Sequence, residues 1–396
     1  MTSHLTPFRL SLLANHFPAL HGARVLGILS VIQIHVTFEL GARGWLPINS
    51  WVYNLSQHLW FGMDLFFFLS GFLIGTILLL PEAEGTSGTL RFYGRRAFRI
   101  IPLYYVVLTA LVFYKQPLDA LQKSQLWREY LYLTNYSDVK HVVMVWAWSL
   151  CVEEHFYFLI PLLLALVKRV PSHRGRITAL LLLWLSGGFV RTLVARTIPS
   201  ARPEEGFVRI YIPSHTRYDI LLAGVLLAYL WHTERSRIEA SMQKRWIQLA
   251  SLALSVIVFG SLVLVPGSAL GGYWGVLAIG TVTGLGYLNL VTYLITTKGL
   301  LVRFLGHRIF LSCATLGYGV YLVHMPLVLA FGLPGFLYIA FARALPPLLA
   351  VAFATLLVFG VSLAIAYVLH LVVEKPALIA RDKFVAAKGA PRRLPQ

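Results

Sequence analysis

A histidine lies deep inside the first long apolar segment of the chain. His35 follows Arg24 by eleven residues, which is about 16 Å along an α-helix and places the imidazole near the middle of a lipid bilayer. Imidazole acts as a base, an acid or a nucleophile near neutral pH, so His35 could carry out a buried transfer step. Glu39 lies one helical turn further on and could orient the ring. A histidine that only packs or bridges helices is an equal alternative.

Two adjacent carboxylates stand in the segment WAWSLCVEEHFY, residues 146–157. Ser149, Glu153 and Tyr157 recur at spacings of four and therefore share one face of a helix. This polar stripe predicts that Glu153 points into the protein, whereas Glu154 is expected nearer a helix contact or the membrane interface. A glutamate held only by structural hydrogen bonds is the alternative for Glu153.

Two more ionisable residues lie in apolar segments. Asp64 is the only charge in GMDLFFFLSGFLIG, where the pair Ser70 and Gly71 would let helices approach closely. His324 follows Tyr321 by three residues in GYGVYLVHMP, so the two share a face. An ionisable group inside a bilayer costs about 3 kcal/mol even on lenient scales, which makes each one a functional candidate. A hydrogen-bonded structural role is as plausible for both.

Four arginines gather in RFYGRRAFRIIPLYY, residues 91–105. Arg96 and Arg99 are three residues apart and can point the same way if a helix starts early. Guanidinium groups suit phosphate oxygens, although anchoring at the cytoplasmic surface would account for one or two of these arginines. The candidates are expected to form a path from the inner side of the membrane to its outer half, in the order Arg24, Arg96 and Arg99, then His35, then Asp64, Glu153 and His324.

These residues lie on segments whose composition indicates a membrane protein. Hydrophobic residues make up 58% of the 396 residues and charged residues 13%, against about 25% in soluble domains, and the mean hydropathy is +0.71. Apolar runs that cross a bilayer must be helical, because a lone strand leaves its backbone groups unpaired in lipid. The chain is therefore predicted to be all-α, a polytopic transmembrane bundle of about ten helices. They are expected at residues 24–40, 55–80, 98–114, 147–167, 177–195, 215–232, 247–265, 271–296, 310–331 and 347–373.

Positive charge is distributed as in a membrane protein rather than in one that binds nucleic acid. The net charge is +18, but the basic residues form short clusters between apolar runs. Alternate connections carry 23 Lys and Arg residues on one side and 11 on the other, which predicts that both termini face the cytoplasm. Tryptophans near the predicted outer boundaries are expected to be interfacial anchors. They are Trp45, Trp51, Trp60, Trp127, Trp146 and Trp148.

Three regions are expected along the chain. Residues 1–23 form a cytoplasmic N-terminal segment whose apolar stretch is too short for a signal peptide, residues 24–377 form the transmembrane domain, and residues 378–396 form a basic cytoplasmic tail. The tail is expected to be flexible from Arg381 onward and to touch anionic lipid. Cys151 and Cys313 fall inside predicted helices, so neither a disulfide framework nor a metal site is expected. With no appended soluble domain expected, a catalytic site must lie within the bundle.

In their order and spacing, the motifs resemble those of the acyltransferase-3 integral membrane proteins, which O-acylate sugars, surface polysaccharides, peptidoglycan and some macrolide antibiotics. The resemblance covers nearly all of residues 20–377. Single motifs are weak, whereas their order and spacing together are specific. The motifs are GARVLGILSVIQIHV, GMDLFFFLSGFLIG, RRAFRIIPLYY, WSLCVEEHFYFLIP, TRYDILLAGVLLA, YGVYLVHMPLV and VEKP.

The resemblance implies an acyl-coenzyme A donor, most simply acetyl-coenzyme A, which binds on the cytoplasmic side as a substrate, with no cofactor held by the protein. It also implies an essential histidine at His35 and an essential glutamate at Glu153. One departure is His155, where the family more often has glutamine, and this would alter hydrogen bonding beside the site. Some members carry a fused extracytoplasmic esterase-like domain, and none is expected here. The resemblance further implies that the pair Arg96 and Arg99 binds the donor. The full set of donor-binding candidates is Arg24, Arg95, Arg96 and Arg99.

The sequence therefore predicts a membrane O-acyltransferase. It would move an acyl group from acyl-coenzyme A to a hydroxyl of a glycan, a glycolipid or a macrolide-type antibiotic, with the lipid bilayer as its environment and no nucleic acid as partner. His35 would act as general base or as transient acyl carrier, and Glu153 would orient it or stabilise its cation. The supporting candidates are Asp64, Ser149, Tyr157, Tyr321 and His324.

Two other functions fit part of the sequence. A proton-coupled exporter would use the intramembrane histidines and carboxylates as a relay, but neither paired broken helices nor an internal repeat is evident. A non-enzymatic membrane scaffold would explain the hydropathy and leave the intramembrane charges unaccounted for. The acyl chain, the acceptor and the side on which the acceptor waits stay open at this point. The relay residues would be His35, Asp64, Glu153 and His324.

Overall fold

The computed structural model describes residues 17–199, 205–264, 278–329, 332–342 and 344–387. These residues form helices and turns and contain no strand, which confirms the predicted all-α class. The α-helices are α1 (Ala19–Ala42), α2 (Trp51–Gln57), α3 (Phe61–Leu78), α4 (Gly85–Tyr114), α5 (Ala120–Tyr130), α6 (Trp148–Lys168), α7 (His173–Ala195), α8 (Tyr218–Thr233), α9 (Arg235–Met242), α10 (Arg245–Leu264), α12 (Thr283–Thr296), α13 (Leu300–Leu305), α14 (Arg308–Thr315), α15 (Gly317–Leu329), α16 (Leu333–Ala342), α17 (Pro347–Leu369) and α18 (Lys375–Ala387).

The helices of the described residues account for all the predicted spans. Eight helical segments are long and apolar enough to cross a membrane, and a ninth span is broken where α14 and α15 meet at 65°. The shorter α8 has 16 residues and is buried along nearly its whole length, so protein surrounds it. With α8 and the broken pair, each of the ten predicted spans overlaps a helix, and the prediction of about ten helices is confirmed.

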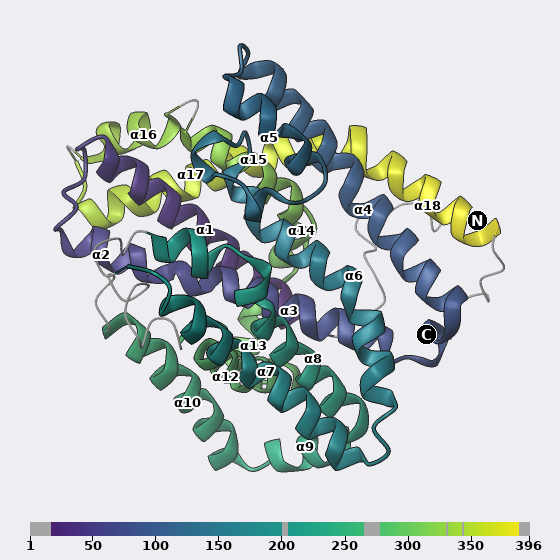
Figure 1. Cartoon of the computed structure of the whole chain (residues 1–396). Coiled ribbons are helices and arrows are strands. Elements are labelled where there is room, and N and C mark those ends of the chain that lie inside the picture. The colour runs from purple at the N-terminus through teal and green to yellow at the C-terminus, as the bar shows by residue number, and fades with distance from the viewer. Residues whose placement is uncertain (1–16, 200–204, 265–277, 330–331, 343, 388–396) are drawn as a thin grey trace, which may run out of the picture.

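The contact between α3 and α8 forms the centre of the bundle (Figure 1). A Cβ atom at Gly71 of α3 would lie 1.9 Å from the carbonyl oxygen of Leu221, and one at Gly224 of α8 would lie 2.1 Å from that of Phe68. Only glycine allows the two backbones to approach so closely. The close helix approach predicted from Gly71 is therefore confirmed.

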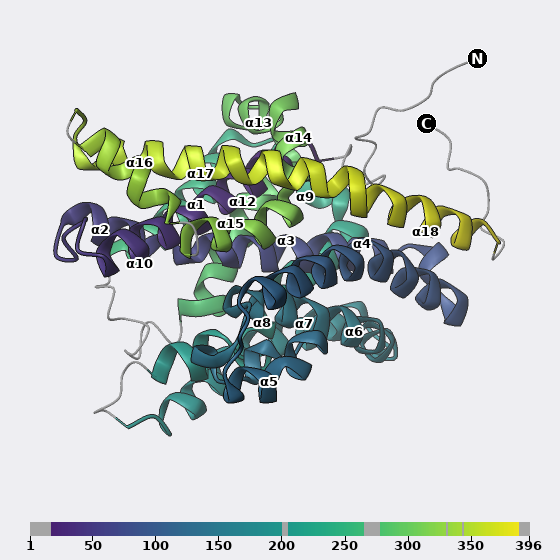
Figure 2. The ribbon, with the colours of Figure 1, turned by 90° about the horizontal axis from the view of Figure 1, so that it is seen from above.

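Other helices lie on both sides of the bundle. Figure 2 shows α17 and α18 following one another end to end along one side, with α5, α6 and α7 on the other side. The first helix, α1, contacts α3, α15 and α17, and α4 contacts α18. Side chains of α1 therefore meet those of α15, which lies almost 300 residues later in the sequence.

The tryptophans before and at the start of α6 are not interfacial anchors. Trp146 and Trp148 are 4% and 8% exposed. The indole Nε1 of Trp146 donates a hydrogen bond to the carbonyl oxygen of Leu322 (3.2 Å). Because the indole N–H has a partner on α15, this end of α6 can be buried without an unpaired donor. By contrast, Trp51 and Trp127 are exposed.

The C-terminal segment also differs from its prediction. Residues from Arg381, expected to be flexible, continue α18 as a helix as far as Ala387, and α18 packs on α4. Residues 1–16 and 388–396 of the expected terminal segments lie outside the described residues. The cytoplasmic location of the two termini stays a prediction.

Candidate active site

Two histidines from α1 and α15 form a hydrogen-bonded pair. His35 Nδ1 lies 3.1 Å from His324 Nε2, and the ring centroids are 5.2 Å apart. His324 is completely buried, whereas His35 is half-buried. His324 Nδ1 in turn lies 2.6 Å from the carbonyl oxygen of Tyr321. The structure thus brings together two residues that the sequence analysis ranked separately.

The carbonyl group determines where the protons of this pair lie. A carbonyl oxygen only accepts, so His324 Nδ1 carries the proton that is donated to Tyr321. In a neutral His324 the Nε2 atom is then an acceptor, and His35 Nδ1 must donate to it. The Nε2 atom of a neutral His35 consequently has a free lone pair. This form of imidazole can remove a proton from a hydroxyl or attack a carbonyl carbon.

Tyr321 connects the histidine pair to α6. Its hydroxyl donates to the carbonyl oxygen of Trp146 (2.7 Å), so the hydroxyl of Ser149, which also bonds it, must be the donor in that contact. Both hydroxyls therefore have partners inside the protein. They hold α15 against α6 and fix the carbonyl to which His324 donates.

Glu153 belongs to a second group of polar residues, one helical turn along α6 from Ser149. Ser70 of α3 donates a hydrogen bond to its carboxylate (2.6 Å), and the Tyr157 hydroxyl lies within electrostatic range of it. The guanidinium of Arg96 lies 3.6 Å from the centroid of the Tyr157 ring. The predicted polar face of α6 is therefore confirmed, since Ser149, Glu153 and Tyr157 all contact polar partners from other helices.

Three of the predicted donor-binding arginines lie together, and two of them, Arg24 and Arg96, lie beside Glu153. Arg24 of α1 interacts electrostatically with Glu153, Arg96 and Arg99. The Arg96 Nε atom is buried and has no hydrogen-bond partner among the described residues, so it can still donate to a ligand. Arg95 is exposed. Helices α1 and α4 thus build a cationic cluster with spare donors, a suitable site for a polyanion.

The structure separates pairs that the sequence analysis joined. Glu39 forms an ion pair with Arg43, one turn further along α1, and His324 contacts His35 instead. Glu153 bonds Ser70 rather than His35. It lies in the arginine cluster rather than towards the other end of the bundle. Glu153 is related to the histidine pair only through Tyr321, which lies within electrostatic range of Glu153 and accepts the hydrogen bond of His324.

Asp64 is held by a buried ion pair that the sequence analysis missed. Arg217 Nη2 donates to Asp64 Oδ1, and the Thr283 hydroxyl donates to Oδ2 (2.7 Å). Neither Nε nor Nη1 of Arg217 has a partner in the described part of the chain. Asp64 is thus hydrogen-bonded and paired, as the structural role considered for it in the sequence analysis requires.

A second ion pair lies close by and was also missed. Arg191 of α7 donates two hydrogen bonds to Asp219 of α8, at 2.9 and 2.8 Å, and both side chains are completely buried. Thr281 bonds both partners of this pair. The charged residues inside the predicted spans 177–195 and 215–232 could have indicated these ion pairs, because an intramembrane charge needs a partner. The motif TRYDILLAGVLLA contains two of the four paired residues.

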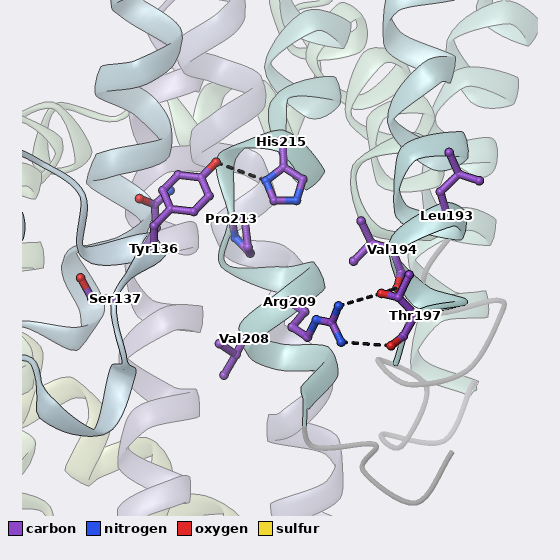
Figure 3. A pocket seen from close by; sticks show the side chains of 10 residues that line it. Tyr136, Ser137, Leu193, Val194, Thr197, Val208, Arg209, Pro213 and His215 are labelled. Carbon is purple, nitrogen blue, oxygen red and sulfur yellow. Dashed lines mark hydrogen bonds between the residues drawn. The ribbon is translucent and has the colours of Figure 1, made fainter. Parts of the chain in front are cut away.

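An open hollow lies away from the histidine pair, between the 3-10 helix Thr134–Tyr136, the end of α7 and residues 208–215 (Figure 3). Its volume is about 520 Å³. The rings of Tyr136 and His215 face it from one side, and Arg209 and Thr197 are hydrogen-bonded to each other on the other. The sequence analysis passed over these residues because polar side chains are ordinary in connections between spans.

Comparisons with known proteins add to this geometry. The family described as acyltransferase domain matches residues 17–367. The peptidoglycan O-acetyltransferase OatA of Listeria monocytogenes is 28% identical over 238 residues, which are 56% of this chain and 35% of that protein. The O-acetyltransferase OatA of Staphylococcus aureus is 26% identical over 336 residues, 79% of this chain and 51% of that protein. The chain thus spans about a third to a half of the relatives it matches. No solved structure matches it.

Proposed function

The chain belongs to the acyltransferase-3 family, and from this premise we propose that it transfers an acyl group from an acyl-coenzyme A thioester to a hydroxyl of a glycan. It is a multi-pass integral membrane protein of the bacterial inner membrane. The observation that carries the proposal is the chain of hydrogen bonds from His35 through His324 to the Tyr321 carbonyl, from which we infer that Nε2 of a neutral His35 carries no proton.

His35 would serve the transfer as a base. Its Nε2 atom takes the proton of the acceptor hydroxyl while the hydroxyl oxygen attacks the thioester carbonyl carbon. The carbon–sulfur bond then breaks, and the proton passes from His35 to the departing thiolate. The products are an ester and free coenzyme A. In the alternative sequence, Nε2 itself attacks the thioester, and the acyl-imidazole then passes its acyl group to the acceptor.

The donor would bind at the arginine cluster. Coenzyme A carries phosphates, and Arg24, Arg96 and Arg99 offer charged donors on one side of the bundle. The unpartnered Nε of Arg96 supports a ligand at this position. The narrow pantetheine arm would then extend along α1, from Arg24 towards His35. Glu153 would fix Tyr157 and balance part of the positive charge.

The acceptor proposal rests on the chemistry named for the relatives. Both relatives are O-acetyltransferases, and the Listeria protein is named for peptidoglycan, a glycan with free hydroxyls. We therefore propose acetyl as the acyl group and a glycan as the acceptor. A glycolipid or a macrolide-type antibiotic offers the same nucleophile and would be distinguished by direct comparison of acceptors.

The exporter alternative has less support. A proton relay through His35, Asp64, Glu153 and His324 requires carboxylates that can take up and release protons. Asp64 is bound by Arg217 and Thr283, and Glu153 lies among arginines. Among the described residues, Asp64 bonds Arg217 and Thr283 and Glu153 bonds Ser70, so the hydrogen-bond partners of the two carboxylates are not residues of the proposed relay.

Release of free thiol from acetyl-coenzyme A tests the proposal. The wild-type chain, purified in detergent, is compared with His35→Ala and with His232→Ala, a control at an exposed histidine. An N-acetylated oligosaccharide or a macrolide is supplied as acceptor, and ester on the acceptor is measured. We expect ester formation by wild type and His232→Ala and a loss of about 10²-fold or more in His35→Ala. Equal rates in all three proteins, or no transfer to any acceptor, would overturn it.

A further inference from the structure

The hollow of Figure 3 has a size typical of small-molecule sites. Its volume of about 520 Å³ lies within the range of about 300–1,000 Å³ found for such sites. Apolar side chains line part of it, and polar side chains line the rest. Its walls come from the connection between α5 and α6, the end of α7 and the connection between α7 and α8, so the fold assembles the hollow. The apolar residues that line it are Leu193, Val194, Val208 and Pro213.

Two rings form a flat surface on one wall. The Tyr136 hydroxyl and His215 Nδ1 are 3.2 Å apart and hydrogen-bonded, and the ring planes differ by only 15°. Tyr136 is 46% exposed and His215 is also exposed. The hydrogen bond holds the two nearly parallel rings next to each other, so each can offer a face on which a ligand can stack.

Asn135, the residue before Tyr136, has a buried acceptor without a partner among the described residues. Asn135 lines the hollow and is 3% exposed. Its Nδ2 donates to Ser214 Oγ (2.8 Å), which also bonds His155 Nδ1 (2.7 Å). Asn135 Oδ1 has no hydrogen-bond partner among the described residues. A buried amide oxygen left unpaired is costly, so this atom is suited to accept a hydrogen bond from a ligand.

The opposite wall carries a charge that is already balanced. Arg209 donates to the Thr197 hydroxyl (2.7 Å) and to its carbonyl oxygen (3.1 Å), and it forms an ion pair with Glu205 (3.3 Å). Among the described residues that line the hollow, there is therefore no excess positive charge with which to hold a phosphate. A neutral ligand with hydroxyl donors fits this environment better than an anion.

We propose that the hollow binds a sugar ring of the glycan acceptor, an inference that rests on the proposed function. A pyranose ring has C–H groups on its faces and hydroxyls around its edge. One face would stack on Tyr136 and His215, and a hydroxyl would donate to Asn135 Oδ1. Ser214 connects this position to His155 of α6, the helix that also carries Ser149. The hollow would thus hold a ring of the acceptor other than the one that reacts.

Direct binding of two trisaccharides tests the site. Tri-N-acetylchitotriose and cellotriose are titrated into the detergent-purified full chain by calorimetry. Tyr136→Ala removes the stacking plane, Tyr136→Phe keeps the ring, and Tyr114→Ala is a control at another exposed tyrosine outside the hollow. We expect Tyr136→Ala to weaken binding about fivefold to tenfold, and the other two variants to stay within about threefold of wild type. No saturable binding by wild type, or equal binding by Tyr136→Ala, would overturn the proposal.

Acceptor kinetics separate this inference from the proposed function. With acetyl-coenzyme A saturating, Tyr136→Ala should raise the KM for the trisaccharide by the same factor and leave kcat within about twofold. Transfer with an unchanged KM would refute the sugar site alone. Saturable trisaccharide binding by a wild type that transfers nothing would refute the transferase function and leave the sugar site standing.

Discussion

The orientation of His35 can be tested through its neighbour, because His324 acts on the reaction only through His35 in this structure. His324→Leu removes the atom to which His35 Nδ1–H donates, whereas His324→Gln offers a side-chain oxygen that can accept the same proton. The two variants therefore differ in the one property that should matter, the presence of an acceptor. His324 is completely buried, and both replacements have no charge.

The size of the effect follows from one hydrogen bond. Such a bond contributes about 0.5–1.5 kcal/mol net, and 1.4 kcal/mol corresponds to about tenfold in an equilibrium. Loss of the bond should lower the population of the reactive tautomer of His35, and with it kcat, by about twofold to tenfold in His324→Leu. The KM for acetyl-coenzyme A should not change, because the arginine cluster is separate from the histidine pair. His324→Gln should retain kcat within about threefold of wild type.

Steady-state thiol release with acceptor saturating is the assay, and thermal unfolding of each variant verifies that the bundle has formed. If His324 itself passed a proton in the reaction, glutamine could not replace it, and both variants would lose about 10²–10⁴-fold. Equal and large losses would therefore refute the positioning role. A fully active His324→Leu would show that the tautomer of His35 does not control the rate.

Two further changes test the donor site and the buried ion pairs. Arg96→Gln removes a charged donor and should raise the KM for acetyl-coenzyme A about tenfold or more. Arg169→Gln removes the same charge at an exposed position and should leave this KM unchanged. An unchanged KM in Arg96→Gln would exclude Arg96 from the donor site. Asp64→Ala leaves Arg217 buried and unpaired and should destabilise the protein by about 3–5 kcal/mol, which is measured as a lower Tm. The double variant Asp64→Ala, Arg217→Leu should recover part of the lost stability. A Tm equal to wild type in Asp64→Ala would contradict the ion-pair assignment.

Several features of this protein follow from local sequence and could be predicted. The helical spans depend on runs of apolar residues, and lipid leaves no other regular structure for a single crossing segment. The inward face of α6 followed from the spacing of Ser149, Glu153 and Tyr157, because helical periodicity fixes relative directions within one helix. His35 could also be selected from the sequence, because an ionisable residue inside an apolar span is costly and is therefore a functional candidate.

The contacts between helices were decided only by the tertiary structure. His35 and His324 are 289 residues apart, and Asp64 and Arg217 are 153 apart. Hydropathy fixes that a segment crosses the membrane but not which helix lies beside it or how each is rotated, because lipid is equally compatible with many arrangements. That freedom is why Glu39 and Glu153 were wrongly considered as direct partners of His35. It is also why the hollow beside Tyr136, built from the α5–α6 connection, the end of α7 and the α7–α8 connection, could be found only after the helices were packed.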